Sequence, residues 1–157
     1  MPGEQYQLRN AKIGDVRAIH RILSQYAQRG LLLGRSLSDL YDQIRDFIVV
    51  VDKKEQTVAA VCSLHICWEE LAEIRSLAVL DVYKGQGIGK KLVLDCIDEA
   101  KEFDIKKLFV LTYVPAFFQK LGFYHVDKSV LPHKVWADCI KCVKFPDCDE
   151  EAMMLDL

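Results

Sequence analysis

A glycine-rich segment between an apolar run and a helical stretch constrains this chain more than any other feature. Residues 83–90 carry glycine at three alternate positions, Gly85, Gly87 and Gly89. The apolar run at residues 74–80 predicts a strand before the segment, and a helix is predicted to start near Gly89. Glycine lets the backbone turn tightly, so that several N–H groups can point at one ligand. A helix start also favours negative charge. The segment therefore predicts an anion-binding site.

The spacing of these glycines excludes two well-known phosphate-binding loops. The loop that closes with Gly-Lys-Ser or Gly-Lys-Thr is absent, because Gly89 and Lys90 are followed by Lys91. The dinucleotide-binding pattern is Gly-x-Gly-x-x-Gly, whereas the spacing here is Gly-x-Gly-x-Gly. The pattern that remains is Lys84-x-x-Gly87-x-Gly89.

Length and composition indicate one ordinary domain. The chain has 157 residues, of which 51% are hydrophobic, and we expect a single domain over residues 1–157. Its net charge of −2 argues against a nucleic-acid partner, which a basic face would hold. No apolar stretch approaches the roughly 20 residues that cross a bilayer, so no membrane partner is expected. Six cysteines, together with a polar N-terminus that lacks an export signal, indicate a reducing, cytoplasmic location.

The hydrophobic pattern predicts helices and strands in the order ααβββαβαβ(β). This order describes a mixed α/β layered domain. The predicted helices cover residues 14–29, 36–46, 89–103 and 116–121, and Ser36 is expected to cap the second of them. The predicted strands cover residues 47–51, 57–67, 73–80, 108–113, 124–126 and 135–138. The acidic tail at residues 147–156 is predicted to be a solvated helix or extension.

The glycine-rich pattern resembles the pyrophosphate loop of the GNAT acyl-CoA-dependent N-acetyltransferases, which is usually Arg/Gln-x-x-Gly-x-Gly/Ala. Residues 71–79 look like the central strand of that family, and residues 117–123, which end in Leu-Gly-Phe, look like its later helix. The predicted order of elements is also the GNAT order. The resemblance implies a GNAT-type mixed central sheet and an enzyme that uses acetyl-CoA as co-substrate. A glycine turn in another α/β protein is the alternative.

The resemblance also implies where acetyl-CoA binds. Main-chain N–H groups of the loop would hold the pyrophosphate, and the pantetheine arm would run beside the central strand as an added strand. A main-chain N–H near Ala78 or Val79 would polarise the acetyl carbonyl. Phe118 would pack against the cofactor. The residues assigned to the cofactor are Leu77, Ala78, Val79, Lys84, Gly85, Gln86, Gly87, Ile88, Gly89, Lys90 and Phe118.

Glu73 is the side chain expected to remove a proton from the acceptor amine, which must be neutral to attack. It precedes Leu77 and Val79 by four and six residues in the same predicted strand, hence on the same side. Several GNAT enzymes use a glutamate at this place as general base. An ion pair with Arg75 or another cation is the alternative. Many members carry a tyrosine acid where this chain has Phe118, so no general acid is assigned.

Three segments resemble the amino-acid N-acetyltransferases, the N-acetylglutamate synthases: residues 28–36, 117–123 and 134–142. This resemblance implies a small acidic acceptor, foremost L-glutamate, whose carboxylates need cations. Arg35 is the leading candidate for binding the acceptor, Arg75 is the second and Lys134 is the third. Each of the three has a surface charge as its alternative.

The sequence leaves other functions open. A GNAT enzyme that acts on a protein lysine or an N-terminal amine is the first alternative, and a CoA-binding sensor without turnover is the second. Replacing Arg35 discriminates between a small acidic acceptor and a protein acceptor, because only the former needs a carboxylate-binding cation. A homodimer is also left open.

The cysteines of the tail, Cys139, Cys142 and Cys148, have a spacing known from metal sites. Ordinary thiols are the alternative, because one Cys-x-x-Cys without a second pair is a weak signal. No metal is assigned. The other cysteines fall on predicted strands or a helix and are expected in the core: Cys62, Cys67 and Cys96.

Overall fold

The computed structural model describes residues 5–132 and 150–157, which divide into two compact units. Unit 1 comprises the residues up to Leu64 together with Ile74–Asp98, and unit 2 comprises His65–Glu73 together with the residues from Glu99 onward. Three elements run through both units: β3 (Thr57–Trp68), β4 (Leu71–Val79) and α3 (Ile88–Glu102). Each unit has a hydrophobic core of its own.

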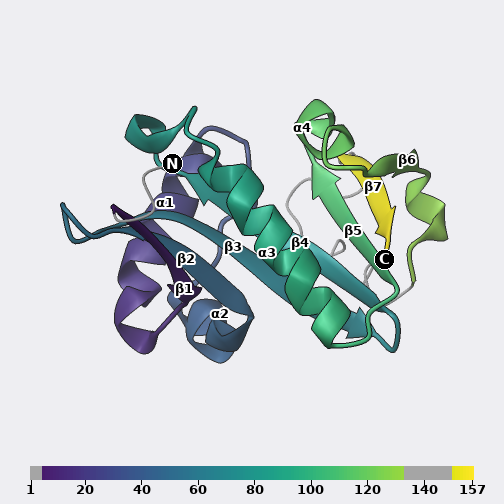
Figure 1. Cartoon of the computed structure of the whole chain (residues 1–157), viewed down its shortest axis with the longest axis horizontal. Coiled ribbons are helices and arrows are strands. Elements are labelled where there is room, and N and C mark those ends of the chain that lie inside the picture. Colours follow the sequence, from purple (N-terminus) through teal and green to yellow (C-terminus); the bar gives the residue numbers. More distant parts are fainter. Residues whose placement is uncertain (1–4, 133–149) are drawn as a thin grey trace. The chain divides into compact units, whose positions relative to one another are not determined.

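The strands of unit 1 lie in the order β1-β2-β3-β4 (Figure 1). β1 (Tyr6–Asn10) pairs antiparallel with β2 (Phe47–Asp52), and β2 pairs antiparallel with β3. All but one of the six residues of β2 are buried. A continuous buried run is typical of a strand that is covered on both faces.

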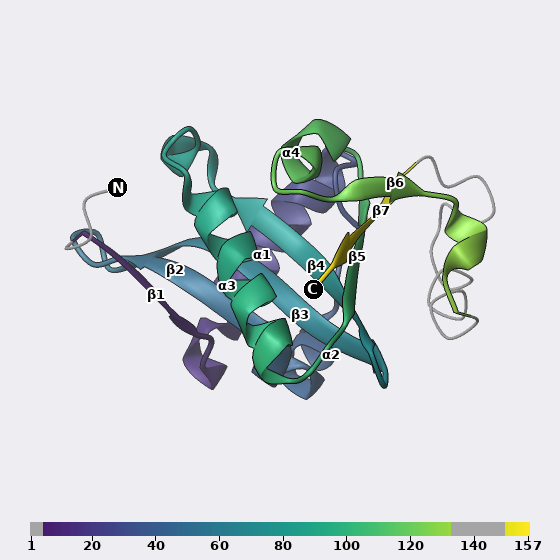
Figure 2. The same ribbon diagram turned by 45° about the vertical axis from the view of Figure 1, so that its right-hand side comes forward.

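Helices cover both faces of the unit 1 sheet, as Figures 1 and 2 show. On one face, Ile19 of α1 (Val16–Gln28) and Leu40 of α2 (Leu37–Asp42) pack in a core with Phe47 and Val49. On the other face, the Sγ atoms of Cys96 in α3 and Cys62 in β3 lie 3.8 Å apart. The apolar residues whose spacing predicted the first helix therefore form its buried face.

α2 begins where the sequence predicts a cap. The N–H of Asp39 donates to Ser36 Oγ at 3.1 Å, which confirms Ser36 as the capping residue. The helix ends at Asp42 and a 3-10 turn, η2 (Ile44–Asp46), follows it, so the predicted helix is too long. In the part of the chain that the structure describes, no helix is long and apolar enough to cross a membrane.

The strands of unit 2 lie in the order β4-β5-β7-β6. The first residues of β4 pair in parallel with β5 (Lys107–Thr112). β7 (Glu151–Asp156) lies antiparallel between β5 and β6 (Tyr124–Val126). α4 (Pro115–Gln119) follows β5, and Gly122 after it has a φ of +97°, which favours glycine at the end of a helix.

The prediction for the acidic tail is wrong. Residues 151–156 form the inner strand β7, and three side chains in it are buried: Ala152, Met153 and Met154. The charges of this segment lie at the two ends of the strand. Glu151 Oε2 is 3.1 Å from His125 Nδ1, and Asp156 Oδ1 is 3.5 Å from Lys107 Nζ. The acidic residues at both ends of the strand led to the wrong prediction, although the residues between them are apolar.

β1 is a strand that the sequence pattern does not predict, because only Tyr6 of its five residues is buried. The order of elements therefore begins with a strand. Apart from α2, the other predicted elements that fall on described residues agree with the structure to within two residues. The predicted strand at residues 135–138 lies outside the described residues. The mixed α/β class is confirmed, and so is the burial of Cys62, Cys67 and Cys96.

Candidate functional site

β4 presents a main-chain edge in unit 1. Just after this strand, the N–H of Leu80 donates to the carbonyl of Ala59 in β3 at 2.9 Å. Successive residues of a strand direct their main-chain groups to opposite edges, so those of Val79 point away from β3. Ser76 has a φ of +56°, in the left-handed region that is rare inside a strand. A residue of this kind breaks the alternation of faces along β4.

The glycine-rich loop joins β4 to α3 through two left-handed residues. Gly85 has a φ of +80° and Gly87 a φ of +78°, conformations that strain an L side chain. The carbonyl of Gly87 accepts the first hydrogen bond of α3, from the N–H of Lys91 at 3.1 Å. Three N–H groups precede that bond and are the orphan donors of a helix start: those of Ile88, Gly89 and Lys90. This arrangement suits an anion.

Two tyrosines anchor the loop within unit 1. Tyr6 Oη donates to Gln86 Oε1 at 2.8 Å, and Tyr83 Oη donates to Asp52 Oδ2 at 2.6 Å. The two rings meet edge to face, with centroids 5.9 Å apart. The bond from Tyr83 lowers the pKa of the buried Asp52 carboxyl, and the same bond raises the pKa of Tyr83 to about 12.

Tyr83→Phe is expected to lower the free energy of unfolding at neutral pH by about 1.5–3 kcal/mol, the range for a hydrogen bond to a charged group. The pKa of Tyr83 in the folded protein, about 12, lies above its ordinary value of 10.0. The stabilising contribution is therefore complete below pH 10.0 and is lost as the pH rises toward 12. Urea unfolding from neutral to alkaline pH measures both effects. If the variant lost stability above pH 10.0 as steeply as the parent, the hydrogen bond from Tyr83 to Asp52 would not be the cause of the pH dependence.

Asp81 gathers two cations beside the loop. Its carboxylate accepts from Arg29 Nη1 and Nη2 at 3.1 and 2.9 Å, and Lys84 Nζ lies 3.0 Å from Oδ1. The hydrogen bonds from Arg29, and then that from Lys84, lower the pKa of Asp81 to about 2. Arg29 Cζ and Lys84 Nζ also lie 5.8 and 5.3 Å from the centroid of the Tyr26 ring. The predicted charge at Lys84 is thus held in place by Asp81.

The Arg35 guanidinium lies beside β4. Its Nη1 is 3.5 Å from Ser76 Oγ, and its Nη2 donates to Gln43 Oε1. Its Cζ lies 5.6 Å from the centroid of the Phe47 ring. The structure therefore brings the leading candidate for acceptor binding to the left-handed residue of β4.

The structure says less about the other predicted acceptor-binding cations and about the tail cysteines. Arg75 is half-buried in β4, and its carbonyl accepts from Ser63 Oγ at 3.2 Å. Among residues 5–132 and 150–157, no group of three His, Cys, Asp or Glu side chains could hold a metal ion. Four predicted or weighed residues lie outside the described residues: Lys134, Cys139, Cys142 and Cys148.

Glu73 belongs to unit 2, where it is 7% exposed and lies opposite Phe109 in the pairing of β4 with β5. Its assignment to the same side of the strand as Leu77 assumed strict alternation. The left-handed Ser76 comes between the two residues, so that assumption does not hold along β4. The sequence argument for a shared side therefore loses its basis.

Phe118 is also part of unit 2 and is 2% exposed. Its ring meets those of Phe117 and Phe123 edge to face, with centroids 5.0 and 5.3 Å away. The phenylalanine that replaces the tyrosine of many GNAT enzymes is therefore part of an aromatic cluster.

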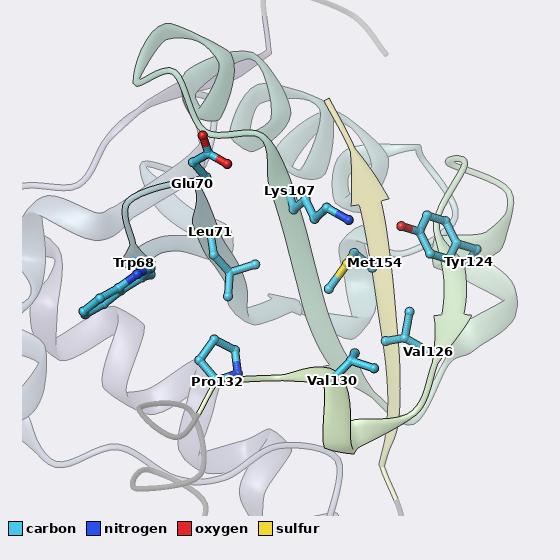
Figure 3. A pocket seen from close by; sticks show the side chains of 9 residues that line it. All are labelled: Trp68, Glu70, Leu71, Lys107, Tyr124, Val126, Val130, Pro132 and Met154. Carbon is cyan, nitrogen blue, oxygen red and sulfur yellow. The ribbon is translucent and has the colours of Figure 1, made fainter.

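Unit 2 also holds a cavity of about 400 Å³ (Figure 3). Its lining is mostly apolar and aromatic: Trp68, Glu70, Leu71, Lys107, Tyr124, Val126, Val130, Pro132 and Met154. Leu71 and Glu73 are two residues apart in β4 and share a face of it. No predicted site residue of the described chain lines this cavity.

The profile of the acetyltransferase (GNAT) family matches residues 16–123, which is more than half of the chain and includes β4, the loop and α3. The chain is a GNAT acetyltransferase. Acetyl-CoA is therefore its co-substrate, and it is an N-acetyltransferase, as the resemblance implied.

Two curated proteins are similar to this GNAT acetyltransferase. The uncharacterized N-acetyltransferase CT2212 of Chlorobaculum tepidum is 40% identical over 157 residues, which cover 100% of both chains. The amino-acid acetyltransferase of Mycobacterium tuberculosis is 31% identical over 130 residues, which cover 82% of this chain and 74% of that protein.

Solved structures share the fold. Rv2747 from Mycobacterium tuberculosis, solved in complex with CoA, has a TM-score of 0.82 at 27% identity, covering 96% of this chain and 99% of that one. N-acetylglutamate synthase from Neisseria gonorrhoeae, solved with coenzyme A and N-acetyl-glutamate, has a TM-score of 0.87 at 23% identity. The match covers 97% of this chain and 35% of that chain, so it shows a common fold within a longer protein.

Sequence reasoning missed the residues that surround the edge of β4: Tyr26, Arg29, Gln43 and Asp81. Tyr26 Oη hydrogen-bonds to the main chain of Val79, which was predicted to contact the cofactor. Tyr26 has the spacing of an apolar helix face, and 53 positions separate it from Val79. No local pattern in the sequence signals a contact over that separation.

Proposed function

We propose that this GNAT acetyltransferase transfers the acetyl group of acetyl-CoA to the amino group of a small acidic amino acid, with L-glutamate as the first candidate. One observation carries the proposal: Arg35 Nη1 lies 3.5 Å from Ser76 Oγ, on the strand that leads into the glycine-rich loop. The planar fork of arginine binds carboxylates in a bidentate manner. The relative named an amino-acid acetyltransferase supports an amino acid as the acceptor. Arg75 and Lys134 are the further proposed carboxylate ligands.

The glycine-rich loop and β4 are proposed to hold acetyl-CoA. The left-handed glycines and the donors at the start of α3 form a surface of N–H groups that fits a pyrophosphate. Lys84 and Lys90 supply positive charge beside it, the former fixed by Asp81. The edge of β4 that the main-chain groups of Leu77 and Val79 share fits an amide-bearing pantetheine arm, because edge pairing needs only main-chain groups.

Acetyl transfer requires a neutral amine and a polarised carbonyl. We assign the proton removal to Glu73 because several GNAT enzymes use a glutamate at this place as general base. The resemblance implies a donor near Ala78 or Val79. Ala78 shares the edge of Leu80, which faces β3, and the N–H of Val79 donates to Tyr26. We therefore assign the oxyanion donor to the N–H of Leu77, which shares the edge of Val79.

The leaving group needs no dedicated acid in this scheme. A free thiol has a pKa near about 8.5, so CoA departs readily as a thiolate. Phe118, where many relatives have a tyrosine, is therefore compatible with turnover. Packing against the cofactor is the role that the resemblance implies for Phe118, and it requires the ring, which is 2% exposed without ligand, to become accessible.

Thiol release from acetyl-CoA across a panel of amines tests the acceptor. The panel contains glutamate, aspartate, glutamine, lysine and a lysine-containing peptide with a free N-terminus. We expect kcat/KM for glutamate to exceed that for glutamine by roughly tenfold or more, because a site built for a charged group rejects its neutral isostere. Turnover of the peptide without turnover of glutamate or aspartate would assign a protein acceptor. Binding of CoA without any turnover would indicate a sensor.

A further inference from the structure

The Tyr26 hydroxyl makes two hydrogen bonds to one residue of β4. It accepts from the N–H of Val79 at 3.0 Å and donates to the carbonyl of Val79 at 2.7 Å. A hydroxyl can do both, because it has one donor and two acceptor positions. In a strand, the N–H and C=O of one residue face the same neighbour. Tyr26, a residue of helix α1, therefore takes the place of a residue from an adjacent strand.

The edge that Tyr26 occupies is the one that β3 leaves open. Leu80 pairs with Ala59 of β3, so Val79 faces the opposite edge. A ligand that adds to this edge like a strand needs the same main-chain groups of Val79. The pantetheine arm of acetyl-CoA carries amides with this donor and acceptor chemistry. Tyr26 and the arm would therefore compete for one N–H group.

The ring of Tyr26 is tied to the start of the glycine-rich loop. Lys84 Nζ and Arg29 Cζ lie 5.3 and 5.8 Å from its centroid, distances at which a cation is attracted to an aromatic face. Asp81 binds both cations. A change in the hydrogen bonding of Tyr26 can therefore shift Lys84, the residue at which the loop begins.

We propose that Tyr26 sets the affinity for acetyl-CoA. Its hydroxyl pairs with Val79 in the free enzyme and gives up the N–H of Val79 to an amide carbonyl of the pantetheine arm when the co-substrate binds. The exchange lowers the affinity, because the ligand gains only the difference between two hydrogen bonds. In the free enzyme the same hydroxyl keeps the strand edge from being left exposed. This proposal rests on the co-substrate part of the proposed function and is independent of the acceptor.

Tyr26→Phe tests the proposal, because it removes the hydroxyl and keeps the ring. Calorimetric titration with CoA, in the absence of any amine, is expected to give a Kd about threefold to tenfold lower than that of the parent. The Tm of the free variant is expected to fall, and CoA is expected to raise it by more than in the parent. An unchanged or higher Kd overturns the proposal. Tyr41→Phe, at a tyrosine that is 40% exposed on α2, is the matched control and should change neither quantity.

A second measurement uses the unaltered enzyme and does not depend on the variant folding. NMR of enzyme labelled at tyrosine Cζ and at backbone amides follows the two partners during a CoA titration. We expect the Tyr26 Cζ and Val79 amide signals to shift together while the Tyr41 signal stays in place. Signals of Tyr26 and Val79 that do not move when CoA binds overturn the proposal. Neither experiment contains an acceptor, so a failure of glutamate turnover would contradict the proposed acceptor alone.

Discussion

Arg35→Ala is expected to raise the KM for glutamate by about 30-fold or more, the effect of losing roughly 2 kcal/mol of a charged hydrogen-bonded contact. The KM for acetyl-CoA is expected to change by no more than about twofold, because the loop and the edge of β4 remain in place. The KM for glutamate is expected to rise because the variant loses the guanidinium that lies beside Ser76 Oγ and over the Phe47 ring. Initial rates at varied glutamate and saturating acetyl-CoA measure the effect.

Two variants separate recognition of a carboxylate from general loss of charge. Arg35→Lys keeps one positive charge but loses the planar fork, and its KM for glutamate should fall between those of the parent and the alanine variant. Arg45→Ala removes an exposed arginine of the same unit and should leave the KM unchanged. A KM for glutamate that is unchanged in Arg35→Ala, with an unaltered thermal transition, would refute the acidic-acceptor proposal.

The features that the sequence predicts well are those set by neighbours in the chain. The glycines of residues 85–89 predict a tight turn, and the structure has a positive φ at Gly85 and Gly87. The cap at Ser36 depends on an N–H only three residues away. The helix after the loop follows from an apolar face with helical periodicity. In each case the residues that decide the structure lie within one or two turns of chain.

Pairing between distant residues is what the sequence does not predict. β7 lies between β5 and β6, but its four apolar residues stand between acidic ones, and the charge of residues 147–156 taken together suggests solvent. Tyr26 reads as a residue of an apolar helix face, yet its hydroxyl satisfies Val79. Arg35 is predicted as a candidate ligand, but Gln43, which accepts its hydrogen bond, carries no signal of its own. Long-range partners of this kind define the candidate site, so it is predicted less completely than the fold.

Ser76 shows why a correctly predicted strand does not by itself support an inference about which side chains share a side. The apolar run predicts β4 to within two residues, and strict alternation would then place Glu73 with Leu77. A left-handed φ at a serine has no sequence signature comparable with that of glycine, because few non-glycine residues adopt it. The strand was therefore predictable, whereas the direction of its side chains beyond Ser76 was not.

Gly87→Ala is expected to raise the Kd for CoA by roughly fivefold to thirtyfold without lowering the Tm of the free enzyme. A Cβ at Gly87 would meet nothing within 4 Å, so the penalty comes from its φ of +78° alone, about 1–2 kcal/mol for an L residue. Gly87 is exposed and follows the part of the loop that Tyr6 and Tyr83 anchor, so its φ can relax away from this conformation, which transfers the penalty from folding to binding. Gly14→Ala is the control, since its Cβ also meets open space and its φ is not positive. A lower Tm with an unchanged Kd would show that the loop stays strained, and would refute the inference that its left-handed geometry is what the pyrophosphate recognises.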